Sequence, residues 1–261
     1  MTQFFEELSP QAIEQVADLM RQAKSLAILT GAGISAESGI PTFRDALTGL
    51  WERFDAEDLA TADAYRRDKE LVWGWYEWRR MKVLLSQPNP GHVAIARLAE
   101  RLPQCTLITQ NVDDLHERAG SQSVLHLHGS LHSPRCFACA RPFSFSDGIP
   151  DEPDGGRRLK PPVCAHCGGF IRPGVVWFNE GLTPEIWAAA DQAVRACDVL
   201  LTIGTSGMVY PAAGLPALAQ HLGKTVIVIN PNPTEQDRYA TLCLRGPAGQ
   251  VLPAVVARLV D

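Results

Sequence analysis

Four of the seven cysteines stand in two close pairs, Cys136-x-x-Cys139 and Cys164-x-x-Cys167, with 24 residues between the pairs. Four thiolates can surround one zinc ion tetrahedrally and leave no position open for water. The spacing is a little longer than in most zinc ribbons, but the pattern predicts a structural zinc ion. The alternative is a loop of free, reduced cysteines. His166 lies between two predicted ligands, and we interpret it as a bystander.

A glycine turn, GAGIS at residues 31–35, directly follows the short apolar run SLAILT at residues 25–30. The backbone N–H groups of such a turn can approach a pyrophosphate, because no side chain stands in the way. Ala36 occupies the sixth position of the motif, as the dinucleotide-binding fingerprint permits, but no acidic residue ends the next strand to bind a ribose. Taken alone, the turn is compatible with phosphate binding and with an ordinary strand-to-helix connection.

Tyr76 and Arg79 lie three positions apart in the segment WGWYEWRRM, which has a helical pattern. Residues at this spacing project from the same face of a helix. Arginine offers a charged fork of donors and tyrosine a hydroxyl donor, so this face could bind a carboxylate. The alternative is a solvated helix face with aromatic packing.

Short apolar runs alternate with helical stretches along the chain, as in an α/β fold with a mostly parallel, doubly wound sheet. The expected strands are residues 25–30, 105–109, 198–203 and 225–229, and the expected helices include residues 10–23, 92–101 and 184–197. Ser9 is the expected N-cap of the first helix. In such folds the ligand lies at the carboxyl ends of the strands, which here carry the segments GAGIS, QNVDD, GTS and NPN.

Two regions interrupt this alternation, and we expect them to form a smaller lobe. Residues 45–87 are rich in Trp, Tyr and Arg with helical periodicity, and residues 132–173 hold the paired cysteines and a loop rich in proline, glycine and charge. We therefore expect residues 1–261 to form a single domain with a small lobe that is part helical and part zinc module. The Rossmann-like large lobe then comprises residues 10–44, 88–131 and 174–261.

Composition narrows the classes of partner. The net charge is −5 and the sequence pI is 5.8, so the chain has no overall basic field for nucleic acid. No apolar run approaches the roughly 20 residues that span a bilayer, and the first residues lack the pattern of a secretion signal. Paired cysteines fit a reducing compartment better than a disulfide framework. We expect a cytoplasmic protein with no membrane or nucleic-acid partner.

Several longer strings follow one another in the order found in the sirtuin family. They are GAGISAESGIPTFRD at residues 31–45, TQNVDDLHERAG at 109–120, LHGS at 127–130, the two cysteine pairs, GTS at 204–206 and NPN at 230–232. The chain resembles sirtuins from about residue 24 to residue 250. The resemblance implies an NAD-dependent protein-lysine deacylase with one structural zinc ion.

The resemblance also implies which residues bind NAD and which act on it. The expected NAD contacts are Gly31, Ala32, Gly33, Ser35, Phe43, Arg44, Gln110, Asn111, Asp113, Gly204, Thr205, Ser206, Asn230, Pro231, Asn232 and Ala248. His128 matches the general base and Asn111 a second catalytic residue, whereas His126 does not match the base. A histidine that titrates near neutral pH can take a proton from a ribose hydroxyl.

In the implied reaction, the acyl-lysine oxygen attacks C1′ of the nicotinamide ribose and nicotinamide leaves. The 2′-oxygen then attacks the imidate carbon, and water completes the hydrolysis to free lysine and O-acyl-ADP-ribose. Val175, Val176 and Phe178 match the cleft in which the substrate peptide adds as a strand.

The resemblance extends to the acyl group. Tyr76 and Arg79 match the Tyr-x-x-Arg motif of sirtuins that accept succinyl- and malonyl-lysine, and Ala56 matches a small residue that enlarges the acyl pocket there. We expect the removal of succinyl, malonyl and acetyl groups from protein substrates by a monomer. The alternatives are a mono-ADP-ribosyltransferase and an NAD-sensing zinc-ribbon binding module.

Overall fold

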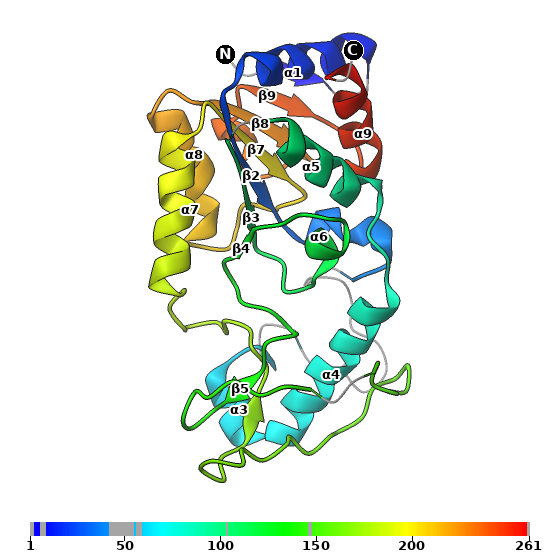
Figure 1. Cartoon of the computed structure of the whole chain (residues 1–261), viewed down its shortest axis with the longest axis vertical. Helices are drawn as coiled ribbons and strands as arrows, with labels where there is room; N and C mark the ends of the chain where they lie inside the picture. The colour runs from blue at the N-terminus through cyan, green and yellow to red at the C-terminus, as the bar shows by residue number, and fades with distance from the viewer. Residues whose placement is uncertain are drawn as a thin grey trace.

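The computed structural model describes residues 3–5, 9–41, 55, 59–102, 104–145 and 148–259. Its centre is a seven-stranded sheet of order β1-β9-β8-β7-β2-β3-β4 (Figure 1), and every neighbouring pair is parallel. The strands are β1 (Gln3–Phe5), β2 (Ser25–Thr30), β3 (Gln104–Thr109), β4 (Val124–His126), β7 (Val199–Ile203), β8 (Thr225–Ile229) and β9 (Leu242–Leu244). The expected α/β fold with a parallel sheet is confirmed.

Helices cover both faces of this sheet, because each face carries a row of buried aliphatic side chains. The face with α1 (Pro10–Gln22), α5 (Pro90–Arg101) and α9 (Ala248–Arg258) encloses one apolar cluster. The other face packs against α7 (Pro184–Ala196) and α8 (Leu215–His221). The first helix begins as predicted, since Ser9 Oγ accepts a hydrogen bond from Ala12 N at 3.1 Å.

The other end of the molecule holds α3 (Ala62–Arg67), α4 (Lys69–Leu85) and the antiparallel pair β5 (Arg135–Cys136) and β6 (Ile171–Arg172) (Figure 1). Helix α4 is buried around most of its circumference because it packs against two apolar clusters. The backbone of residues 157–159 packs closely on one side of α4 at Gly74. A Cβ added to Gly74 would lie 2.0 Å from the Arg157 carbonyl oxygen, so no larger residue fits there. Helix α4 thereby joins the cysteine region to the rest of the fold.

A short helix, α6 (Leu115–Arg118), follows β3. The described residues also contain the 3-10 turns η1 (Ala32–Ile34), η2 (Ala36–Ser38), η4 (Ala212–Gly214) and η5 (Asp237–Tyr239). Over the described residues, no helix is both long enough and apolar enough to cross a membrane.

Candidate active site

A cavity of about 800 Å³ opens at the carboxyl ends of β2, β3, β7 and β8. This is the edge at which a doubly wound sheet binds its ligand. The predicted NAD and catalytic residues among its lining come from five separate segments: Gly31, Ala32, Gly33, Ser35, Gln110, Asn111, Asp113, His128, Gly204, Thr205, Ser206 and Asn230.

The glycine turn after β2 packs directly on the turn after β7. Gly33 N donates to the Gly204 carbonyl oxygen at 2.8 Å, and a Cβ on Gly33 would lie 2.7 Å from that same oxygen. Gly204 has a φ of +60°, which a glycine adopts without strain. The two glycines are therefore required for contact between the loops as well as for any approach of a phosphate.

The turn after β3 is fixed to the glycine turn through the hydroxyl of Ser35. Ser35 Oγ donates to Asp113 Oδ2 at 3.0 Å and accepts from Asn111 Nδ2 at 3.1 Å. His92 Nε2 lies 3.4 Å from the same hydroxyl, and Asn89 N donates to His92 Nδ1 at 3.3 Å. Because Nδ1 accepts, Nε2 carries the proton and donates to Ser35. Burial lowers the pKa of His92 to about 4, so the ring is neutral near pH 7.

Hydrogen bonds from side-chain amides hold the turn after β7, which contains Thr205. Gln110 Nε2 donates to Thr205 Oγ1 at 3.0 Å, and Asn230 Nδ2 donates to the Thr205 carbonyl oxygen at 2.9 Å. These bonds join the ends of β3, β7 and β8 into one rim.

His128 follows the edge strand β4 and faces the cavity. Its Nδ1 lies 3.0 Å from the Gln110 carbonyl oxygen, which can only accept, so Nδ1 carries the proton. Nε2 is then the nitrogen with a lone pair. Burial lowers the pKa of His128 below its ordinary value, although the bond to Gln110 opposes that effect. A neutral imidazole with this tautomer can act as a base at neutral pH.

A segment that contains Val175, Val176 and Phe178 also lines the cavity. Val176 N donates to the His128 carbonyl oxygen at 2.8 Å, and Phe178 N donates to that of Ala60 at 2.9 Å. The segment thus lies between His128, which follows β4, and Ala60, which precedes α3. Phe178 is 36% exposed, which places it at the mouth of the cavity.

Tyr76 and Arg79 on α4 both line the cavity, as their helical spacing predicts. Trp177 Nε1 donates to the hydroxyl oxygen of Tyr76 at 3.0 Å. Indole is only a donor, so the tyrosine keeps its own proton for another partner. Burial raises the pKa of Tyr76 to about 12, which keeps the hydroxyl protonated. The Arg79 guanidinium carbon lies 4.9 Å from the ring centre of Trp75.

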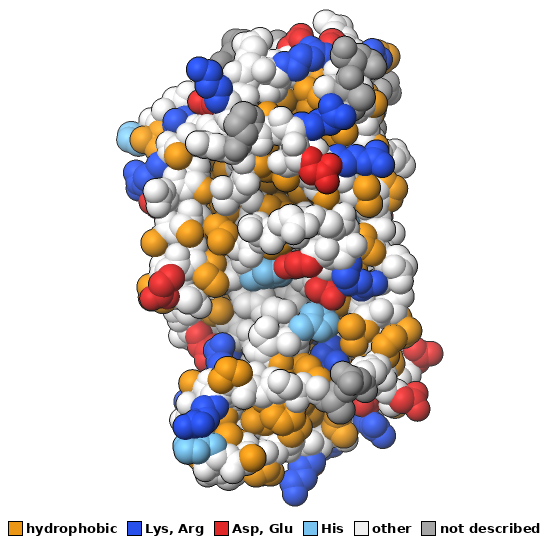
Figure 2. Space-filling view, in the orientation of Figure 1, with side chains coloured by type: hydrophobic (Ala, Val, Ile, Leu, Met, Phe, Trp, Pro, Cys, Tyr) orange, Lys and Arg blue, Asp and Glu red, His pale blue; other side chains and the backbone are white. Residues whose placement is uncertain are grey.

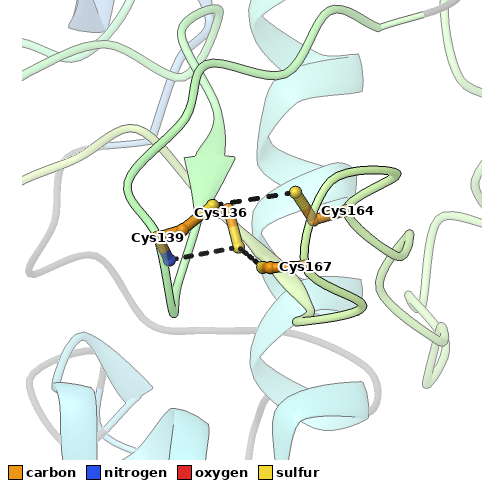
Figure 3. A group of neighbouring side chains, drawn as sticks. All are labelled: Cys136, Cys139, Cys164 and Cys167. Atoms are coloured by element: carbon orange, nitrogen blue, oxygen red, sulfur yellow. Dashed lines mark hydrogen bonds between the residues drawn. The ribbon is translucent and has the colours of Figure 1, made fainter.

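The four paired cysteines converge, with their sulfur atoms within 4.8 Å of one another (Figure 3). The Cys136–Cys167 and Cys139–Cys164 sulfur atoms are 3.5 and 3.8 Å apart. Zn–S bonds of about 2.3 Å in a tetrahedron place the sulfurs roughly 3.8 Å apart, so the cluster fits a zinc ion. The four ligands would fill its coordination, which fits a structural metal.

Comparison with known proteins decides the family. The chain matches the model of the Sir2 family over residues 31–211. This chain belongs to the Sir2 family, the sirtuins.

This sirtuin is 58% identical to the NAD-dependent protein deacylase of Methylococcus capsulatus, over 92% of this chain and 94% of that protein. It is 56% identical to NAD-dependent protein deacylase 1 of Pseudomonas aeruginosa, over 93% of this chain and 97% of that one. A crystal structure of a Sir2 homologue in complex with NAD superposes with a TM-score of 0.88 at 43% identity, covering 100% of this chain and 96% of the other.

Three predicted residues of this sirtuin cannot be placed, and three described ones are not among the residues that line the cavity. Phe43, Arg44 and Ala56 lie outside the described residues. Pro231 and Asn232 are exposed after β8, and Ala248 is buried at the start of α9, none of them among the lining residues. Their roles in binding stay predictions.

Sequence reasoning missed His92, which contacts the Ser35 hydroxyl, and Trp177, which lines the cavity beside Tyr76. His92 follows Asn89 and Pro90 at the third position of a helix, where its ring reaches back to the N-cap. That capping position is the one signal that could have identified it. Trp177 lies between Val176 and Phe178 in the sequence, and nothing in this apolar run indicates its hydrogen bond to Tyr76.

Proposed function

We propose that this chain removes acyl groups from protein lysines and consumes NAD, giving nicotinamide and O-acyl-ADP-ribose. The observation that carries the proposal is the position of His128. Its ring lies in one cavity with the glycine turn and with the Val175–Phe178 segment, and its Nδ1 bond to Gln110 leaves Nε2 as the base. The names of the bacterial relatives support the same activity.

NAD supplies the ribose carbon that takes the acyl oxygen. The chain holds the two reactants and moves the proton. Ser206 offers a hydroxyl group at the rim, and Gln110 and Asn111 offer amides that pair with an amide or ribose. His128 accepts a proton at Nε2 while Nδ1 keeps the ring in place.

The peptide binds against the Val175–Phe178 segment. This segment is already held on both sides by backbone hydrogen bonds to His128 and Ala60. An extended substrate that pairs with it would direct its lysine towards His128, with Val175, Val176 and Phe178 beside the aliphatic stem.

The acyl pocket accepts succinyl and malonyl groups as well as acetyl. Arg79 supplies a cation and Tyr76 a hydroxyl proton, and both line the cavity from α4. A carboxylate accepts hydrogen bonds from both, whereas an acetyl methyl group needs neither.

The test is mass spectrometry of one peptide that carries acetyl-lysine or succinyl-lysine, incubated with and without NAD. We expect NAD-dependent loss of both groups. Arg79→Met should lower desuccinylation about tenfold or more, because a charge-assisted bond is lost, and leave deacetylation within about twofold. Arg67→Met, an exposed residue of α3, is the matched control. Equal losses for both acyl groups would contradict the carboxylate pocket.

The remaining features of the proposal concern the whole chain. The substrates are acylated proteins in the cytoplasm, where the four zinc-binding thiols stay reduced. We propose a monomer whose single domain divides into the predicted large and small lobes. On the face drawn in Figure 2, Lys and Arg side chains are interspersed with acidic and uncharged ones, which supports the absence of a nucleic-acid partner.

A further inference from the structure

A second histidine, His126, lies two residues before His128 on β4 but is not among the residues that line the cavity. Its ring lies between two other groups. Nδ1 is 3.1 Å from the Asn111 carbonyl oxygen, and Nε2 is 2.7 Å from Glu117 Oε1 on α6.

Both partners of His126 accept hydrogen bonds, since one is a backbone carbonyl and the other a carboxylate. A neutral imidazole carries one N–H and can donate to only one of them. The two contacts together therefore require the imidazolium, with a proton on each nitrogen. Burial works against this charge, but the hydrogen bonds to Glu117 and Asn111 and the charge of Glu117 raise the pKa of His126 above its ordinary value.

The charged ring joins two parts of the segment that follows β3 and carries several predicted NAD contacts. Asn111 lies at the beginning of this segment and Glu117 lies in α6 at its end. The Asn111 side chain also donates to Ser35 of the glycine turn. We propose that the imidazolium of His126 is a positioning group that holds Asn111, and with it the NAD-binding turn, in its binding conformation.

Other charges near His126 do not replace Glu117. His116 is neutral, because burial keeps its pKa well below the ordinary value. Asp113 accepts a hydrogen bond from Ser35, and its charge raises the pKa of His126 less than that of Glu117 does. Asp114 pairs with Arg118 at 3.6 Å and lies 3.5 Å from His132. Helix α7 packs on the opposite face of β4, where Leu125 and Leu127 belong to its apolar cluster.

The consequence is a dependence on pH that is separate from that of His128. A pKa raised by binding partners means that the contact is complete at low pH and is lost as the pH rises through that pKa. NAD affinity should therefore fall as the pH rises through that raised pKa, by about tenfold if one charge-assisted bond is lost. His128 acts in the opposite direction, since it must lose a proton to serve as the base.

Glu117→Gln is the decisive variant, because the amide nitrogen can donate to Nε2 of a neutral ring that still donates from Nδ1 to Asn111. We expect its KM for NAD to stay nearly constant between about pH 6 and pH 9, whereas that of the wild type rises at the alkaline end. His126→Gln should raise KM most at low pH, where the wild-type contact is complete, with a difference from the wild type that shrinks at the alkaline end and a much smaller effect on kcat. His221→Gln, an exposed histidine at the end of α8, should behave as the wild type.

Two further measurements distinguish a failure of this inference from a failure of the proposed function. Only the KM measurements depend on the proposed function. Proton–nitrogen NMR of histidine-labelled protein should show both ring nitrogens of His126 protonated at neutral pH, with the signal assigned by its loss in His126→Gln. Calorimetric titration with NAD gives the affinity without turnover. A neutral His126 in the NMR spectrum, or an alkaline loss of NAD affinity that persists in Glu117→Gln, would overturn the inference even in an active deacylase.

Discussion

At the scale of single residues, the hydrogen bond from His128 to the Gln110 carbonyl decides which ring nitrogen is the base. The sequence could identify His128 by its motif but could not assign the tautomer, because Gln110 reaches the ring only through the pairing of β3 with β4. The same holds for Tyr76, whose hydroxyl direction depends on Trp177, far away in the sequence. Motifs indicate the residue types of a site, and the orientation of their protons follows from the tertiary structure.

The lowered pKa of His128 predicts the acidic limb of the pH profile. The imidazolium cannot accept a proton, so kcat/KM should fall as the pH decreases through a value below about 6.5. His128→Ala should lower kcat by about 100- to 10,000-fold, measured as free lysine peptide formed per minute. His221→Ala serves as the control. If the acidic limb persists in His128→Ala at a reduced rate, the limb belongs to the titration of another group.

At the scale of elements, two contacts between distant segments were beyond the reach of sequence patterns. The turn at residues 31–35 predicts phosphate binding, but its close packing on Gly204 depends on β2 and β7 being neighbours in the sheet. The strands β1, β4 and β9 are three residues long, which is too short for a recognisable pattern. The longer buried strands and the capped helices were predicted within one or two residues, because periodicity and caps are local signals.

The contact between the two glycine turns can be tested by one added methyl group. In Gly33→Ala the new Cβ would lie within 3.0 Å of backbone atoms of Gly204, which cannot rotate away. We expect a loss of about 1–3 kcal/mol in the free energy of unfolding and a weaker affinity for NAD. In Gly214→Ala the Cβ has no atom within 4 Å, so that variant should keep both values. Denaturant unfolding and NAD titration are the measurements, and a stable, tight-binding Gly33→Ala would show that the turn can move.

The cysteine region is the second element that can be tested by itself. Cys139 N and Gly169 N donate to the sulfurs of Cys136 and Cys167 at 3.5 and 3.4 Å, as expected around thiolate ligands. Arg172 of β6 also forms an ion pair with Glu180 at 2.5 Å, close in sequence to the Val175–Phe178 segment. Loss of zinc should therefore disorder this region and abolish peptide turnover indirectly.

We expect a chelator to release about one zinc ion per chain, together with loss of near-ultraviolet circular dichroism and of deacylation. Cys139→Ser should lose zinc, the circular dichroism signal and deacylation, as the chelated protein does. Cys197→Ala removes a buried thiol outside the cluster and should keep its zinc. Metal-free protein that remains folded and active would contradict a structural role for the cluster.

At the scale of the whole molecule, the sheet edge and the α4 region meet over a single cavity, and this arrangement accounts for the order of the sequence motifs. The turns proposed to bind NAD come from the strand ends, and the proposed base follows the edge strand β4. The pair proposed to bind the acyl group, Tyr76 and Arg79, comes from α4. Sequence order alone indicated the family and the fold. The closeness of Tyr76 to the Val175–Phe178 segment required the folded chain.

Deacylation by this mechanism is tested most directly by the ratio of nicotinamide released to acyl groups removed, with and without acylated peptide. We expect one nicotinamide for each acyl group and almost none without peptide, because the acyl oxygen itself displaces nicotinamide. Nicotinamide released at the same rate without any acylated peptide would contradict it and would indicate NAD hydrolysis or ADP-ribosyl transfer instead.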